Sequence, residues 1–149
     1  MNTYSSSLFA ALAALVASTA VSMAAVEMTV YKTPWCGCCH AWAEAVEKAG
    51  YKVSTVDLED LSAIRKQAGV PADMEGCHVA AVNGYFLEGH VPLKSVGKLL
   101  SERPQVAGLA VPGMPQGSLG MGDETSAYEV YAVPRDTSEA PSVFYKAST

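Results

Sequence analysis

Three of the four cysteines in this 149-residue chain lie within four positions. Cys36, Cys38 and Cys39 belong to the run Cys-Gly-Cys-Cys-His, and the fourth cysteine, Cys77, also precedes a histidine. A disulfide requires Cα atoms about 4.4–6.8 Å apart and a torsion of about 90°, which the neighbours Cys38 and Cys39 reach only with backbone strain. Clustered thiolates instead suit a soft metal ion such as Cu(I) or zinc. The run therefore predicts a chemical site.

The distribution of the cysteines favours Cu(I) over zinc. A zinc site made of four thiolates normally combines two pairs of closely spaced cysteines. Here the cysteines divide three and one, with Cys38 next to Cys39, and this suits thiolates that bridge more than one Cu(I). Zinc remains an alternative. An iron–sulfur cluster is disfavoured, because an exported cluster needs a twin-arginine signal and no arginine pair precedes the apolar N-terminal stretch.

The N-terminus indicates export. Residues 1–26 contain no charged side chain, and residues 8–16 form a compact apolar stretch followed by small residues. This pattern predicts a signal peptide over residues 1–24, cleaved after Ala24, with cleavage after Ala20 as the alternative. Because no Lys or Arg precedes the stretch, a retained anchor competes with this interpretation, although the stretch is short for a span of about 20 residues. Cleavage would leave one domain, residues 25–149, in the oxidising periplasm with no membrane span.

The charge balance limits the partners of the mature domain. Ten basic and fifteen acidic side chains give a formal net charge of −5. A mildly acidic surface disfavours nucleic acids and anionic membranes but permits the binding of cations.

Alternating strand and helix patterns surround the cysteines. A β-prone run at residues 28–31 leads into them, and a helix with its apolar residues at helical spacing is expected from Cys38 or Cys39 to Gly50. The cysteines would then lie at a helix N-terminus, where unpaired N–H groups stabilise thiolates. The other expected elements are strands at 53–56, 77–82 and 85–87, helices at 61–68 and 93–103, a long loop at 111–122, and a closing strand pair at 128–133 and 142–145.

This order of elements, with Trp-Cys-Gly-Cys-Cys between the first strand and the first helix, resembles the thioredoxin fold. Cys36 and Cys39 match the redox positions of its Trp-Cys-Gly-Pro-Cys motif, and Cys38 replaces the proline. Cys77 and His78 stand where thioredoxins carry a cis-proline. The resemblance implies an α/β, thioredoxin-like domain with a central mixed sheet flanked by helices and a C-terminal extension made of a loop and a strand pair.

A narrower resemblance covers nearly the whole mature chain. The segments Cys-Gly-Cys-Cys-His at 36–40, Gly-Cys-His at 76–78, Gly-His-Val-Pro at 89–92 and Gly-Leu-Ala-Val-Pro-Gly-Met-Pro at 108–115 are similar to those of the CopG-type exported copper-resistance proteins. That family implies copper as the ligand and other exported copper-handling proteins as partners. The segment 117–121 departs from the family pattern at Leu119, where we expect a looser loop.

Two functions of different class follow from these residues. In the first, the protein binds one or several Cu(I) ions for sequestration, transfer or interconversion with Cu(II). The expected ligands are Cys36, Cys38, Cys39 and Cys77, with His78, His90, Met114 and Met121 as further candidates. His40 is expected to face solvent. In the second, the protein is a thiol–disulfide oxidoreductase with Cys36 as nucleophile and Cys39 as resolving thiol. Four cysteines in two structural disulfides are a third possibility.

Overall fold

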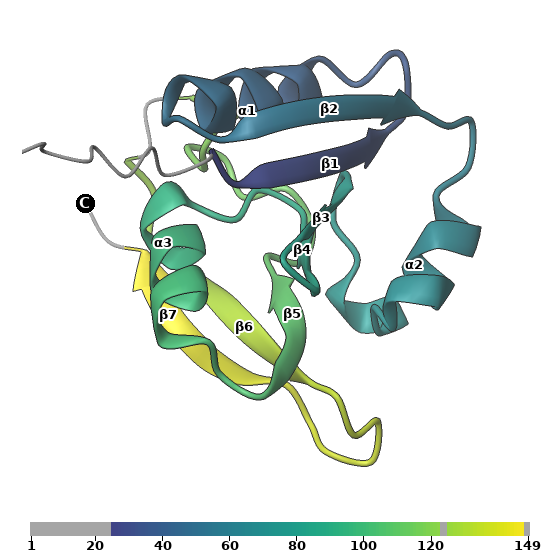
Figure 1. Ribbon diagram of the computed structural model, residues 1–149, viewed down its shortest axis with the longest axis vertical. Helices are drawn as coiled ribbons and strands as arrows, with labels where there is room; N and C mark the ends of the chain where they lie inside the picture. The colour runs from purple at the N-terminus through teal and green to yellow at the C-terminus, as the bar shows by residue number, and fades with distance from the viewer. Residues whose placement is uncertain (1–24, 123–124, 148–149) are drawn as a thin grey trace, which may run out of the picture.

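The computed structural model describes residues 25–122 and 125–147. Within these ranges, seven strands form one mixed sheet in the order β2-β1-β3-β4-β5-β6-β7, accompanied by three α-helices and one short 3-10 helix (Figure 1). The expected α/β class is confirmed, whereas the predicted signal peptide lies outside the described residues. The elements in chain order are β1 (Glu27–Lys32), α1 (Gly37–Lys48), β2 (Lys52–Asp57), α2 (Ser62–Ala68), η1 (Ala72–Met74), β3 (Val79–Val82), β4 (Tyr85–Glu88), α3 (Leu93–Glu102), β5 (Val106–Ala110), β6 (Tyr128–Pro134) and β7 (Ser142–Ala147).

The first four strands place the cysteine segments at one end of the sheet. β1 pairs in parallel with β2 and antiparallel with β3, and β3 pairs antiparallel with β4. The β3–β4 connection is the expected two-residue turn, in which Asn83 and Gly84 have φ values of 46° and 80°, as a type I′ hairpin requires. The end of β1 therefore lies beside the start of β3, and the segments that carry Cys36 and Cys77 leave the sheet together.

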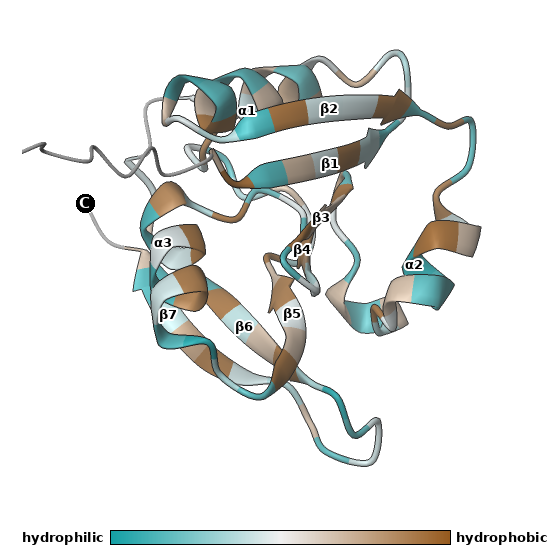
Figure 2. Ribbon diagram, in the orientation of Figure 1, coloured by the Kyte–Doolittle hydropathy of each residue, from teal (hydrophilic) through white to brown (hydrophobic). Residues whose placement is uncertain are grey.

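Helices cover both faces of the sheet. On one face, α1 and α3 pack on alternate residues of the central strands, and the core there includes Trp42, Val46, Val96 and Leu99. On the other face, Ile64 of α2 packs with a smaller cluster built on the intervening strand residues. The hydropathy colouring shows that α1 and α3 carry both apolar and polar surfaces (Figure 2), as helices with one buried face do.

Two expectations about strands are corrected. β5 was not among the expected elements, and Gly108 lies within it. The structure explains this glycine, since a Cβ there would overlap the carbonyl and ring of Phe86 on the neighbouring strand. The strand expected at 77–82 begins only at Val79, so Cys77 and His78 lie in the segment that enters it. The closing pair β6 and β7 is confirmed, and β5 joins it to the same sheet.

Candidate metal centre

The first turn of α1 arranges three of the four cysteines. Cys36 is the N-cap residue, with an extended backbone, and its Sγ accepts a hydrogen bond from the backbone N–H of Cys39 at 3.3 Å. The sulfur thus takes the place of the hydroxyl or carboxylate oxygen that usually caps a helix. Cys39 is fully buried, whereas Cys36 and Cys38 are half-buried. One helical turn therefore directs three sulfurs toward the same end of the helix.

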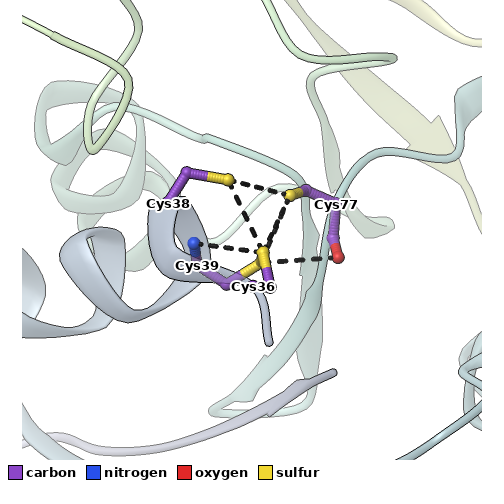
Figure 3. A group of neighbouring side chains, drawn as sticks. All are labelled: Cys36, Cys38, Cys39 and Cys77. Carbon is purple, nitrogen blue, oxygen red and sulfur yellow. Dashed lines mark hydrogen bonds between the residues drawn. A yellow bond between two sulfur atoms is a disulfide. The ribbon is translucent and has the colours of Figure 1, made fainter. Parts of the chain in front are cut away.

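Cys77 completes the cluster from the opposite side. Its Sγ lies 3.3 Å from Sγ of Cys36, 3.3 Å from that of Cys38 and 3.2 Å from that of Cys39 (Figure 3). Cys36 and Cys39 are joined by a disulfide, while Cys38 and Cys77 carry free thiols. All four sulfurs lie within 4.8 Å of one another. The structure thus brings together every cysteine that the sequence singled out.

The donor set fits a soft metal ion after reduction. With metal–sulfur bonds of about 2.3 Å, a tetrahedral ion holds its sulfurs about 3.8 Å apart. The sulfur–sulfur contacts of Cys77 are 3.2–3.3 Å, so the cluster would open by about 0.5 Å to admit an ion. The Cys36–Cys39 disulfide must first accept two electrons, because only thiolates bind the metal.

Two buried histidines lie behind Cys77. His78 and His90 are both fully buried, their ring centroids are 5.2 Å apart, and His78 packs on Trp42 at 4.5 Å. The sulfur of Cys77 and a ring nitrogen from each histidine lie within 4.8 Å of one another. Cys77 therefore belongs to two groups of potential ligands.

The hydrogen bonds of the histidines leave nitrogen atoms available. Nδ1 of His90 lies 2.7 Å from the carbonyl oxygen of Leu119, which can only accept, so the neutral ring carries its proton on Nδ1 and presents a bare Nε2. Nε2 of His90 and both ring nitrogens of His78 have no hydrogen-bond partner within the described residues. Buried nitrogens without partners are costly, and coordination of a metal would satisfy one nitrogen of each ring.

The surroundings keep these groups uncharged in the absence of a metal. Burial raises the pKa of the Cys77 thiol to about 12, and the neighbouring Cys38 adds to this effect. Burial also lowers the pKa of His78 to about 3, with His90 and Arg65 contributing, and lowers that of His90. A metal ion would therefore displace a proton from Cys77, whereas the histidines are already neutral at pH 7.

An ion pair that sequence reasoning did not predict, between Arg65 and Glu88, holds the Cys77 segment. Glu88 is fully buried, and its Oε1 accepts hydrogen bonds from Arg65 Nη2 and the Gly76 N–H, both at 2.8 Å. Burial raises the pKa of Glu88, and the Arg65 guanidinium opposes this shift. The sequence signal that could have predicted this ion pair is Glu88 itself, a charged residue at the end of the apolar strand β4.

The remaining candidates lie around this centre. His40 is exposed as expected, with Nε2 3.3 Å from Glu44. Met114 is 55 % exposed and Met121 is half-buried, and their role as ligands stays a prediction. Leu119 is only 5 % exposed and lies in the main core, and the expected looser loop stays a prediction.

Comparisons with known proteins agree with this geometry. Residues 74–121 match a family model described as a protein of unknown function, DUF411, and no curated protein matches the chain. Two solved structures are similar, both described as copper resistance protein copG. Form 2 is 40 % identical with a TM-score of 0.75, over 83 % of this chain and 98 % of that one. Form 1 is 39 % identical with a TM-score of 0.76, and the match covers 85 % of this chain and 100 % of that one. With this identity over the full length of a solved relative, the chain belongs to the CopG family of copper resistance proteins.

Proposed function

We propose that this protein binds Cu(I) in a thiolate cluster and thereby contributes to copper resistance. The observation that carries the proposal is the convergence of four cysteine sulfurs within 4.8 Å of one another. Thiolates select soft ions such as Cu(I), and the similar solved proteins are described as copper resistance proteins. Cys36, Cys38, Cys39 and Cys77 are the proposed ligands.

The two groups that share Cys77 support more than one copper ion. Its sulfur would bridge an ion held with the α1 cysteines and a second ion held with His78 and His90. Because Cys36 and Cys38 are only half-buried, the cluster stays open to ligand exchange on one side. Met114 and Met121, on the loop beside it, are proposed as further thioether ligands. An open site suits transfer of copper, or its interconversion between Cu(I) and Cu(II).

The proposed setting is the periplasm, with residues 1–24 as a signal peptide and residues 25–149 as a single thioredoxin-like domain. Strand order β2-β1-β3-β4, with α1 and α3 on one face and α2 on the other, supports the thioredoxin likeness. Among the described residues, every helix is too short or too polar to cross a membrane. Other exported copper-handling proteins are the proposed partners.

A thiol–disulfide oxidoreductase is the second candidate, and a specific observation favours it. Cys36 and Cys39 are already paired as a disulfide at the N-terminus of α1, where helix N–H groups stabilise a leaving thiolate.

One experiment separates the two functions. The reduced mature protein is titrated against a Cu(I) chelator, with elemental analysis of the bound metal, beside a Cys77→Ser variant. We expect tight Cu(I) binding in the parent, and loss of metal in the variant with Cys36–Cys39 disulfide exchange retained. Reduction of a model disulfide by a parent protein that binds no Cu(I) would contradict copper binding. If the protein retained zinc in preference to copper, the proposed metal would be zinc.

A further inference from the structure

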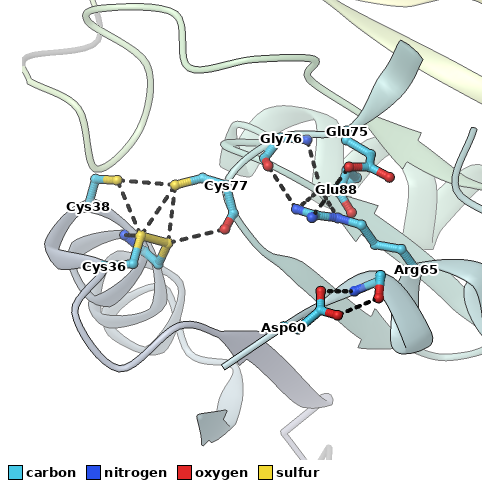
Figure 4. Close-up of polar contacts among 10 residues, drawn as sticks. Cys36, Cys38, Asp60, Arg65, Glu75, Gly76, Cys77 and Glu88 are labelled. Atoms are coloured by element: carbon cyan, nitrogen blue, oxygen red, sulfur yellow. Dashed lines mark hydrogen bonds and ion pairs between the residues drawn. A yellow bond between two sulfur atoms is a disulfide. The ribbon is translucent and has the colours of Figure 1, made fainter. Parts of the chain in front are cut away.

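The segment that carries Cys77 is held by side chains from two distant elements. Arg65 comes from α2 and Glu88 from the end of β4, and Figure 4 shows both side chains converging on Gly76, next to Cys77. The Gly76 N–H donates to Glu88 Oε1 at 2.8 Å, and the Gly76 carbonyl accepts from Arg65 Nη2 at 2.8 Å. Both polar groups of the residue before Cys77 are thus bound by charged side chains.

The ion pair itself is well defined. Arg65 also donates to Glu88 Oε1 through Nε at 3.0 Å and Nη2 at 2.8 Å, and its Nη1 lies 3.5 Å from Glu75. Glu88 is 0 % exposed. Replacing a buried ion pair by apolar residues of similar volume is often neutral or stabilising, so the contribution of this pair to stability does not by itself explain its presence.

Close backbone contacts leave this segment little freedom. A Cβ on Gly76 would lie 2.7 Å from the Gly89 Cα and 3.0 Å from the Val111 carbonyl oxygen. Backbone hydrogen bonds also bind the segment at both ends, from the Gly89 N–H to the His78 carbonyl at 2.8 Å and from the Gly113 N–H to the Glu75 carbonyl at 2.9 Å. The Arg65–Glu88 pair acts between these points, directly before Cys77.

We propose that Arg65 and Glu88 are positioning residues that fix Cys77 Sγ opposite the first turn of α1. The proposal rests on the proposed function only in treating Cys77 as a copper ligand. Without the pair, the Gly76 N–H and carbonyl would lose these hydrogen bonds, and the Cys77 sulfur would lie near the Cys38 sulfur for a smaller fraction of the time. In enzymes, a misplacement of about 1 Å can lower the rate of reaction between two groups by about a hundredfold, so small shifts of the Cys77 sulfur matter.

A disulfide provides a test that contains no metal. In a Cys36→Ser/Cys39→Ser background only Cys38 and Cys77 remain, with their sulfurs 3.3 Å apart. Oxidised glutathione converts these two thiols into a disulfide and is itself reduced to two glutathione thiols. The equilibrium constant, measured by alkylation and mass spectrometry, gives the effective concentration of Cys38 at Cys77.

The variants separate position from charge and from general stability. In this background, Glu88→Leu should lower the effective concentration at least about tenfold, whereas Glu88→Gln, which keeps an acceptor oxygen, should stay within about threefold. Glu27→Leu is the matched control, since Glu27 forms an exposed pair with Lys52 at the start of β1, and it should have no effect. Unfolding in urea identifies variants that do not fold.

Arg65→Lys keeps the proposal testable if Glu88→Leu fails to fold. A lysine can reach Glu88 or the Gly76 carbonyl but lacks the planar fork that binds both, so we expect a loss of about threefold to tenfold. Folded Glu88→Leu and Arg65→Lys proteins with the effective concentration of Glu27→Leu would overturn the proposal, as would an equal loss in Glu88→Gln and Glu88→Leu. In the four-cysteine protein, unchanged Cu(I) affinity despite displacement of Cys77 would contradict the copper function and leave the positioning role standing.

Discussion

Replacing Cys38 with proline should remove tight Cu(I) binding and leave the Cys36–Cys39 redox pair intact. The substitution produces Cys-Gly-Pro-Cys, the arrangement expected of a thioredoxin motif. It deletes one of the four clustered sulfurs, whose distances to Cys36 and Cys77 are 3.5 and 3.3 Å. It therefore separates the two proposed functions at a single position.

The structure predicts that the backbone tolerates this proline. Cys38 is the second residue of α1, and the first four N–H groups of a helix have no acceptor within it. Proline removes such a group at little cost and suits the first turn. The preceding Gly37 adapts readily, since a glycine lacks the Cβ that clashes with a following proline. We expect the free energy of unfolding to change by less than about 1 kcal/mol.

The loss of copper affinity should be much larger than this. Four-ligand thiolate and imidazole zinc sites bind with about 10–16 kcal/mol, so one ligand of four accounts for about 3 kcal/mol, or roughly a hundredfold in the dissociation constant. Competition with a Cu(I) chelator measures the affinity, and urea unfolding measures the stability. Cys38→Ser is the control, because it removes the thiolate without constraining the backbone and should lose the same affinity.

Disulfide exchange with glutathione completes this assay. Both variants should keep a Cys36–Cys39 pair that is reduced and reoxidised as in the parent protein. The reasoning would be refuted by a folded Cys38→Pro variant that binds Cu(I) as tightly as the parent. It would also be refuted if Cys38→Pro lost copper while Cys38→Ser kept it, because the effect would then come from the backbone.

Three further outcomes are expected. Burial lowers the pKa of His78 to about 3, so below about pH 6.5 the unfolded chain binds a proton that the folded chain does not bind. The free energy of unfolding should therefore fall between about pH 6.5 and pH 3 by up to about 1.4 kcal/mol per pH unit. Urea unfolding should show a smaller fall in His78→Leu, and an equal fall in that variant would assign the effect to another group. Burial raises the pKa of Cys77 to about 12, so its thiol must release a proton when Cu(I) binds. The Cu(I) affinity should then rise about tenfold per pH unit near neutrality for each thiol proton released. An affinity that does not change with pH in chelator competition would exclude a protonated thiol as a ligand. Gly120 has φ +83°, and a Cβ there would lie 2.8 Å from the backbone nitrogen of Trp42, so Gly120→Ala should destabilise the fold by about 1–3 kcal/mol. Gly97 in α3 has open space around it, so Gly97→Ala should stabilise the fold by about 0.5–1 kcal/mol. Thermal unfolding measures the stability of both variants.

Local patterns were enough to predict the elements that position the cysteines. The apolar spacing after Cys39 and the glycine at position 50 predicted α1, and the Asn83–Gly84 dipeptide predicted the β3–β4 hairpin; both are confirmed. These signals depend on residues close together in the chain, where helical period and turn chemistry act. The gathering of the four sulfurs followed from the same elements and from the resemblance to a known family.

Features that depend on distant residues could not be predicted in this way. Gly108 interrupts the pattern of β5 because Phe86, on another strand, occupies the space of its side chain. Glu88 is buried because Arg65, from α2, compensates its charge. Neither partner can be identified from sequence spacing. The Cys36–Cys39 disulfide was one of three alternatives that the spacing left open, because a pair of cysteines three residues apart suits both a disulfide and a metal.

The two candidate functions depend on different parts of this structure. Cys36 and Cys39 lie on one helical turn, and their bond requires little beyond the first turn of α1. The proposed copper cluster also requires Cys77, whose segment is held by long-range contacts, among them those of Gly76 with Arg65 and Glu88. Loss of packing around residues 75–78 would therefore abolish the cluster while sparing disulfide exchange. A redox pair confined to α1 needs neither Cys77 nor an ion pair beside it, whereas a function that uses the fourth sulfur needs the Cys77 segment held in place, which is the role we propose for Arg65 and Glu88.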